Sequence, residues 1–245
     1  MDRLIYLSMA GAKATMQRQD VLANNLANLS TAGFRAELQA FRAVPVQGDG
    51  ASTRVYALES TPGHSNEAGP LQTTGRPLDV AMKGDAWLAV QGLDGTEAYT
   101  RAGALELDAE GNLVTVSGLP VQGEGGPITV PAGAAVDIAA DGSVSATVGN
   151  APPQVVGRLK LVTPEAPLQR GLDGLFRAAD GNDLAADPNA RLQAGALEGS
   201  NVSAVETMVA MIAAARQFEQ QMKALQGAEQ RDQAGQKLLA PTLGA

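Results

Sequence analysis

The chain has 245 residues, of which 44% are hydrophobic and 18% charged, so it can form one or two folded domains and is not disordered overall. Aromatic residues make up only 3%, whereas there are 28 glycines and 13 prolines, which favours a turn-rich β fold with alanine-rich helices. Cysteine is absent and there is one histidine. This excludes disulfides, thiolate metal sites, cysteine nucleophiles and multi-histidine zinc sites.

The net charge of −8 is concentrated in the middle of the chain. Residues 44–196 contain nine basic and eighteen acidic side chains, while both ends are close to neutral. Such an acidic body is a poor surface for nucleic acid, so we exclude that class of partner. No apolar run approaches the roughly 20 residues that span a membrane, and the first residues lack the features of a cleaved secretory signal. We therefore expect no membrane insertion, and export, if any, by another route.

The N-terminal segment, residues 1–35, is predicted to be a helix. Apolar residues recur at steps of three and four, with polar residues on the other side, and only Gln19 interrupts the series. Gly33 can adopt the left-handed conformation that ends helices. The predicted apolar stripe consists of Ile5, Met9, Ala12, Met16, Leu22, Ala23, Leu26 and Leu29.

The middle of the chain changes to a period of two. Residues 36–75 are polar and contain glycine and proline, so we expect an irregular connector, followed by a β domain over 76–196. Turn dipeptides at Asp94-Gly95, Asp141-Gly142 and Asp173-Gly174, and the turn Glu110-Gly111-Asn112, separate short strands, which favours an antiparallel sandwich or barrel-like domain. The predicted strands cover residues 79–82, 87–90, 104–107, 113–116, 128–130, 136–138 and 157–162.

The C-terminal segment, residues 197–245, is again predicted to be helical, with Ser200 or Asn201 as its N-cap. The predicted fold is therefore α+β, with terminal helices paired like a coiled coil and a central all-β domain. One partner helix cannot cover so wide a stripe, so we expect the ends to be mobile alone and ordered in an assembly. The apolar positions of this segment are Val202, Val205, Met208, Met211, Ile212, Ala215, Phe218, Met222 and Leu225.

No group of residues favours catalysis over a structural role. His64 lies in a turn-like stretch without an evident partner, so we expect a surface-loop histidine. Asp108 and Glu110 are predicted to serve a hairpin turn. The cluster of Asp180, Asn182, Asp183 and Asp187 resembles a calcium loop only loosely, because its spacing does not match that of an EF-hand. We expect no catalytic residue, no cofactor and no metal.

Motifs at both ends of the chain resemble those of the flagellar rod and hook protein family. The middle of the chain is similar to the family's β domain at Trp87-Leu88-Ala89-Val90 and Tyr99-Thr100-Arg101, so the resemblance covers nearly the whole sequence. The terminal motifs are Ala23-Asn24-Asn25-Leu26-Ala27-Asn28 with Gly33-Phe34-Arg35, and Leu197-Glu198-Gly199-Ser200-Asn201-Val202 with Glu206, Met211-Ile212, Arg216, Phe218-Glu219 and Lys223.

The resemblance implies a structural subunit of the bacterial flagellar basal-body rod, not an enzyme. It implies export through the flagellar type III apparatus, a periplasmic location in the basal body, and helical polymerisation with itself and other rod proteins, proximal and distal, into a hollow drive shaft. The alternatives are a paralogous distal rod subunit and a periplasmic enzyme acting on cell-wall glycan. We expect the apolar stripes to form the subunit interface. The resemblance adds motif residues to it, namely Asn24, Asn25, Asn28, Gly33, Phe34, Ser200 and Asn201.

Overall fold

The computed structural model describes residues 4–45 and 55–239, which fall into two compact units. The helical unit comprises the described residues of Met1–Ala27, Glu37–Gly63 and Ser203–Ala245, and the β unit comprises Asn28–Ala36 and His64–Val202. Residues 1–3 and 240–245, the outer ends of the two expected helical segments, lie outside the described residues.

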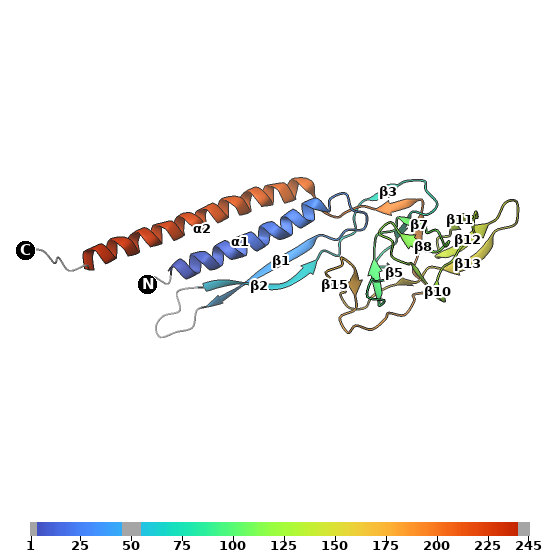
Figure 1. Cartoon of the computed structure of the whole chain (residues 1–245), viewed down its shortest axis with the longest axis horizontal. Helices are drawn as coiled ribbons and strands as arrows, with labels where there is room; N and C mark the ends of the chain where they lie inside the picture. The colour runs from blue at the N-terminus through green and yellow to red at the C-terminus, as the bar shows by residue number, and fades with distance from the viewer. Residues whose placement is uncertain (1–3, 46–54, 240–245) are drawn as a thin grey trace, which may run out of the picture. The chain divides into compact units, whose positions relative to one another are not determined.

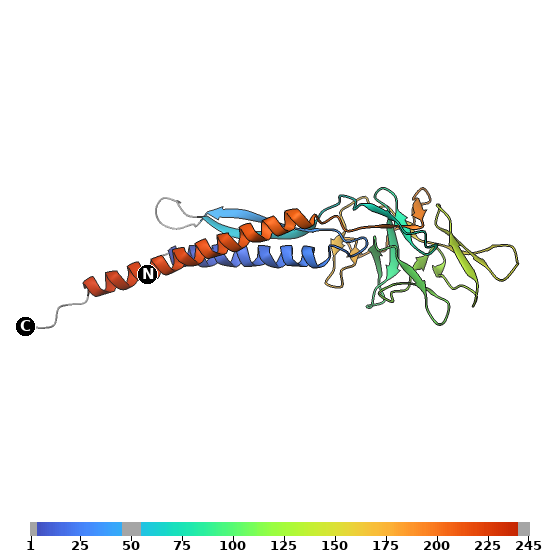
Figure 2. The ribbon, with the colours of Figure 1, turned by 90° about the horizontal axis from the view of Figure 1, so that it is seen from above.

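The helical unit is built from two long helices and one hairpin. Helix α1 (Leu4–Ala27) and helix α2 (Ala204–Leu239) lie side by side, as Figure 1 and Figure 2 show, and this confirms the predicted pairing of the terminal segments. Strands β1 (Glu37–Pro45) and β2 (Val55–His64) form a two-stranded sheet, and β1 contacts α1.

Two expectations for the first 75 residues are wrong. Helix α1 ends at Ala27, earlier than Gly33, because residues 28–33 form turns instead. Gly33 does take a positive φ of 70°, but its place in the β unit requires glycine for another reason: a Cβ there would lie 2.2 Å from the backbone carbon of Arg101. Residues 36–75, expected to be irregular, contain β1, β2 and β3 (Leu71–Thr73). Most of β1 is exposed, so it lacks the alternation of apolar and polar residues that marks a half-buried strand.

The β unit consists of small antiparallel sheets, and none of the described sheets closes on itself. The largest has the strand order β14-β5-β6-β16-β15, and a three-stranded sheet has the order β11-β12-β13; the remaining strands pair as β17-β4, β18-β3, β7-β8 and β10-β9. The strands are β4 (Val80–Met82), β5 (Trp87–Gln91), β6 (Glu97–Thr100), β7 (Leu105–Leu107), β8 (Leu113–Thr115), β9 (Gln122–Gly123), β10 (Gly126–Pro127), β11 (Ala135–Ile138), β12 (Ser143–Thr147), β13 (Gln154–Arg158), β14 (Leu161–Val162), β15 (Gln169–Arg170), β16 (Phe176–Arg177), β17 (Leu192–Ala194) and β18 (Ala196–Glu198).

Strand β5 lies at the centre of the core, because both of its faces are covered. Leu88 and Val90 join the main apolar cluster, whereas Trp87 and Ala89 on the other face join a smaller cluster with Phe176. The predicted turns all form, with the glycine of each in a positive φ. The expected strand at 128–130 is only a bridge at Thr129, and the expected strand at 157–162 is divided between β13 and β14.

Candidate functional site

Helices α1 and α2 meet along a seam of small side chains. The buried threonines need no partner across the seam, because Thr15 donates to the carbonyl of Gly11 (2.9 Å) and Thr207 donates to that of Ser203 (2.8 Å). Among the described side chains of the two helices, the apolar ones that are buried are alanines. The buried residues of the seam are Ser8, Thr15, Thr207, Ala214 and Ala228.

Four large apolar side chains near the start of α2 lie on the side away from this seam. Val205, Met208, Val209 and Ile212 are 73%, 51%, 62% and 56% exposed. Their spacing of three and four residues places them in one stripe, since each residue of an α-helix turns by about 100°. The same rotation places that stripe roughly opposite the buried threonine and alanines of α2. We call these four residues the outer stripe.

Helix α1 and the hairpin carry exposed apolar residues as well. Tyr6, Met9 and Met16 of α1 are each more than half exposed, and so is Leu38 of β1. Several large apolar side chains exposed on one helix and a neighbouring strand favour an interaction site. Charged residues Lys13 and Asp20 follow in the same helix, so the exposed face is mixed rather than purely apolar.

The structure divides the predicted stripe residues into two groups. Met9, Met16, Val205, Met208 and Ile212 are exposed. Tyr6 and Val209, which the sequence analysis did not select, are exposed beside them; their spacing from Met9 and Ile212 would have been the signal. The half-buried group consists of Ile5, Ala12, Leu22, Leu26, Leu29, Val202, Met211, Phe218, Met222 and Leu225, and the small residues Ala23 and Ala215 are exposed. The role of either group in subunit contacts stays a prediction.

The asparagines of the N-terminal motif differ in their surroundings. Asn25 is buried and pairs twice with the backbone of Glu37: its Nδ2 donates to the carbonyl (3.0 Å), and its Oδ1 accepts from the N–H (2.8 Å). The Asn25 side chain thus pairs with both backbone groups of Glu37 and fixes the start of β1 to α1. Asn28 accepts a hydrogen bond from the Thr31 hydroxyl (3.1 Å), and Asn24 is exposed.

A buried ion network joins the two terminal motifs inside the β unit. The Glu198 carboxylate contacts Nη2 of Arg35 (2.9 Å) and both Nε and Nη2 of Arg101 (2.7 and 2.6 Å), and it accepts the N–H of Gly69 (3.0 Å). Arg101 also donates to backbone carbonyls in the 82–86 segment. All three charged side chains are nearly inaccessible, so pairing is what makes their burial tolerable.

Aromatic rings surround this network. Trp87 lies 6.0 Å from the guanidinium carbon of Arg35 and 5.8 Å from that of Arg101, and the Phe34 ring lies 4.7 Å from that of Arg170. Burial lowers the pKa of Arg35, Glu198 opposes this shift, and Arg101 adds to it. Gly33 and Phe34 are therefore part of the interior of the β unit rather than exposed interface residues.

Asn201 holds two segments of the β unit together. Its Oδ1 accepts the N–H of Ala36 (2.6 Å), and its Nδ2 donates to the carbonyl of Glu67 (2.8 Å). The backbone N–H of Gly33 donates to the carbonyl of Glu198 (2.8 Å). Residues of the N-terminal and C-terminal motifs thus contact each other within one chain.

The expected N-cap of the C-terminal helix is wrong. Helix α2 begins at Ala204, and the side chain that caps it is Ser203, whose Oγ accepts the N–H of Glu206 at 3.4 Å. Asn201 is occupied as described above, and Ser200 is buried, its Oγ accepting the N–H of Val202 (3.3 Å).

The carboxylates considered for catalysis serve turns. Both Asp108 oxygens accept hydrogen bonds from Asn112, one from its backbone N–H (2.6 Å) and one from its Nδ2 (2.9 Å), and these bonds lower the pKa of Asp108. Glu110 is exposed at the tip of the same hairpin. This confirms the predicted turn role.

His64 is not the surface-loop histidine that we expected. It is half-buried at the end of β2, edge-on to the ring of Phe176 with centroids 4.7 Å apart. Burial lowers its pKa, and the nearby charges of Arg35 and Arg170 lower it further. The aromatic contact explains the burial of a residue that the sequence placed in a turn.

The acidic residues after β16 do not converge on one point. Asp180 accepts from Nδ2 of Asn182 (2.8 Å), whereas Asp187 accepts from the hydroxyl of Thr163 (2.7 Å). Asp183, the remaining member of the predicted cluster, is exposed. Among the described residues there is no group of three or more histidines, aspartates or glutamates that could hold a metal ion.

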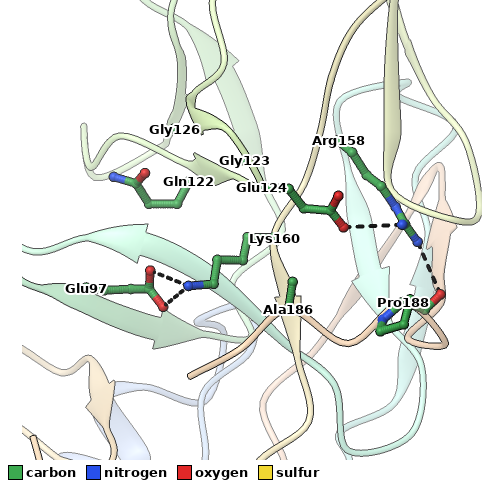
Figure 3. A pocket seen from close by; sticks show the side chains of 9 residues that line it. All are labelled: Glu97, Gln122, Gly123, Glu124, Gly126, Arg158, Lys160, Ala186 and Pro188. Atoms are coloured by element: carbon green, nitrogen blue, oxygen red, sulfur yellow. Dashed lines mark hydrogen bonds and ion pairs between the residues drawn. The ribbon is translucent and has the colours of Figure 1, made fainter. Parts of the chain in front are cut away.

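The β unit has a hollow of about 650 Å³, shown in Figure 3. Its two cations are held by carboxylates: Lys160 contacts both oxygens of Glu97 at 2.8 Å, and Arg158 lies 3.2 Å from Glu124. These ion pairs leave the hollow without the converging nucleophile and base that catalysis requires. The lining residues are Glu97, Gln122, Gly123, Glu124, Gly126, Arg158, Lys160, Ala186 and Pro188.

Three family models match separate parts of the chain. The flagella basal body rod protein model covers residues 5–35, the flagellar hook protein FlgE/F/G D1 domain covers residues 81–146, and the flagellar basal body rod FlgEFG protein C-terminal model covers residues 193–238. The flagellar basal-body rod protein FlgF of Salmonella typhimurium is 50% identical over 98% of this chain and 99% of its own length. The FlgF protein of Escherichia coli is 50% identical over 96% of both chains, and the rod protein FlgG of Bacillus subtilis is 33% identical over 90% of this chain and 93% of its own.

The chain belongs to the FlgE/F/G family of flagellar rod and hook proteins. It is a structural subunit of the basal-body rod and not an enzyme, which confirms the function that the terminal motifs predicted. As a rod protein it assembles with other rod proteins. The described part of the rod subunit contains no helix long and apolar enough to cross a membrane.

Two of the matched regions coincide with the features described above. The match over residues 5–35 contains nearly all of α1 together with Asn25 and Arg35, and the match over residues 193–238 contains Glu198 and most of α2. The family models therefore cover both the helices with their exposed stripes and two residues of the ion network within the β unit.

Proposed function

We propose that this rod subunit polymerises through the outward faces of α1 and α2 into a helical, hollow shaft. The observation that carries the proposal is the outer stripe of Val205, Met208, Val209 and Ile212, which is more than half exposed opposite the seam. Fully burying one such side chain contributes about 1.5–3 kcal/mol, so a neighbour that covered the stripe would add substantially to the stability of the helices.

The seam between α1 and α2 supports the same proposal. Its buried side chains are small or polar, so the exposed large apolar residues of both helices are available to neighbouring subunits. A repeated contact between different faces of identical subunits produces an open helix when its rotation does not close. The terminal helices would then form the inner wall of the shaft, and the shaft would transmit torque from the rotor towards the hook.

Membership of the rod family supports a proposal for the partners and the location of the chain. We infer contacts with further copies of this chain and with proximal and distal rod proteins, and delivery to the periplasm by the flagellar type III export apparatus. The acidic β unit, with seventeen acidic and nine basic side chains, supports a partner other than nucleic acid.

A charge placed in the outer stripe tests the proposal. Ile212→Glu adds one charge at a position that is 56% exposed, so the free chain should fold with unchanged helix content and unfolding midpoint. The amount recovered in isolated basal bodies should fall at least tenfold, and swimming should be lost.

The matched control is Gln217→Glu on the same helix. Gln217 is exposed but lies about 120° around α2 from the outer stripe, so its variant should enter the rod normally. Incorporation of Ile212→Glu at the wild-type level would overturn the proposed role of the stripe.

A further inference from the structure

The β unit contains the same four-residue turn twice. Gly92-Leu93-Asp94-Gly95 connects β5 to β6, and Gly171-Leu172-Asp173-Gly174 connects β15 to β16. In both turns the first glycine donates its N–H to the carbonyl four residues later (2.8 Å in each), and the last glycine donates back to the first (3.0 and 3.1 Å). The last glycines have φ values of 80° and 79°.

Arg177 joins the two turns to each other. Its Nη2 contacts Oδ2 of Asp94 (3.2 Å) and Oδ2 of Asp173 (2.8 Å). The first glycine of each turn leaves room for this guanidinium, since a Cβ on Gly92 or Gly171 would lie 2.9 or 2.8 Å from an Arg177 nitrogen. The two turns are therefore held side by side around one cation.

The leucines of these turns are the most exposed large apolar side chains in the described residues. Leu93 is 90% exposed and Leu172 is 112% exposed relative to the reference for a free leucine. In this structure, neither side chain contributes to a core. Because these two leucines occupy the same position of two turns that share Arg177, chance exposure is a weaker explanation than it is for scattered surface leucines.

The backbone of the turn does not require leucine. Two other hairpins form the same pair of backbone hydrogen bonds, from residue 108 to 112 and from residue 139 to 143. The position that corresponds to the leucines is Ala109 in one and Ala140 in the other, and both alanines are exposed. The leucines therefore need a reason other than the formation of the turn.

We propose that Leu93 and Leu172 form a two-point contact that a second copy of this chain covers in the assembled rod. The proposal rests on the proposed function and adds a contact of the β unit to that of the helices. We call the pair the leucine contact.

The charge around the leucine contact favours a copy of the same chain as the occupant. The β unit carries seventeen acidic and nine basic side chains, so two copies repel each other over much of its surface. At this place, however, Asp94 and Asp173 are balanced by Arg177 and by Arg170, whose Nη2 lies 4.0 Å from where a Gly174 Cβ would be. An equally acidic neighbour can thus approach the leucines without facing a net charge from these four groups.

Single thiols test whether the contact is covered. The chain has no cysteine, so Leu93→Cys and Leu172→Cys each introduce its only thiol, and Ala109→Cys places a thiol at the same position of a turn outside the contact. The rate of modification by a polyethylene glycol maleimide is read as a shift of this chain's band, for the free chain and for isolated basal bodies. We expect at least a tenfold slower reaction at positions 93 and 172 in basal bodies, and less than a twofold change at position 109.

A photoreactive residue at position 93 or 172 identifies the occupant. Ultraviolet irradiation of basal bodies should give a product that contains two copies of this chain, and the residue placed at position 109 should not. A product with a different protein would overturn the proposed occupant, and unchanged maleimide rates at both leucine positions would overturn the contact itself.

The double variant Leu93→Ala and Leu172→Ala separates this proposal from the proposed function. It makes both turns resemble the alanine turns, so the unfolding midpoint should be unchanged while incorporation into rods falls at least fivefold. If this double variant were incorporated normally while Ile212→Glu failed to enter the rod, the leucine contact would be contradicted and the proposed role of the helices would stand. Normal incorporation of Ile212→Glu would instead contradict the proposed function.

Discussion

The two units of this rod subunit differ in the kinds of side chain that they bury. The β unit buries many large apolar residues, such as Leu88, Val90 and Leu105, and even a fully paired arginine, Arg101. Among the described side chains of the two helices, those that are buried are small or polar, while the outer stripe is more than half exposed. The first pattern is that of a complete folded domain, and the second is that of one component of a larger core.

This difference indicates where each unit obtains its stability. Helical stability in proteins comes mainly from the packing of an apolar face, and among the described side chains of α1 and α2 no large apolar one is buried. The β unit has an apolar core and an internal network in which Glu198 pairs with two buried arginines. We therefore expect the stability of the β unit to come from its own core and the helices to gain stability from assembly.

The largest effect should come from removing the shared carboxylate of the β unit. Glu198→Ala leaves Arg35 and Arg101 buried and unpaired, so the free energy of unfolding should fall by about 3–5 kcal/mol in urea denaturation. Glu106→Ala, which removes an exposed carboxylate 3.7 Å from Arg76, is the control and should change stability by less than about 1 kcal/mol. Equal effects of the two substitutions would show that the network does not hold the β unit together.

A pair of truncations compares the two units directly. Leu88→Ala opens a cavity beside β5 and should lower the free energy of unfolding by about 2–5 kcal/mol. Met208→Ala removes a side chain that is 51% exposed, so the free chain should change by no more than about 0.5 kcal/mol. A large loss of stability in the free Met208→Ala chain would mean that α2 is already packed in the single subunit.

The smallest effect concerns pH. Burial and the charges of Arg35 and Arg170 lower the pKa of His64 in the folded chain, so the unfolded chain binds more protons below its ordinary pKa of about 6.5. Stability should therefore decrease as the pH falls below about 6.5, and His64→Asn should flatten this part of the profile.

The control for this experiment is the titration of the aspartates. The pKa values of Asp108 and Asp173 are lowered in the folded chain by hydrogen bonds from Asn112 and from Arg177, respectively. The contribution of these aspartates to the free energy of unfolding is lost only as the pH falls through and below the ordinary aspartate range near 4. The His64→Asn variant should therefore still lose stability in that acidic range. An unchanged slope between pH 6.5 and 5 in the variant would show that another group is responsible.

The sequence predicted features that depend on local patterns. The aspartate–glycine turns at 94–95, 141–142 and 173–174 formed as expected, because a positive φ at glycine is a local requirement. The two terminal helices were evident from apolar residues at steps of three and four. Strand β1 was missed because a mostly exposed strand has no buried face to impose a period of two.

The roles of the motif residues could not be predicted, because they depend on contacts between distant segments. Asn25 was predicted to be an interface residue, and in the structure it forms two hydrogen bonds with the backbone of Glu37. Arg101 and Glu198 are 97 positions apart, and no local pattern indicates that an arginine will be buried beside a carboxylate. The family resemblance contained both residues but did not indicate that they meet.

Amide hydrogen exchange across residues 205–212 tests the central claim most directly. These amides should exchange at least tenfold more slowly in isolated basal bodies than in the free subunit. The reason is that neighbouring subunits in the rod would cover the outer stripe and suppress local opening of α2. Equal exchange rates in the two states would contradict it.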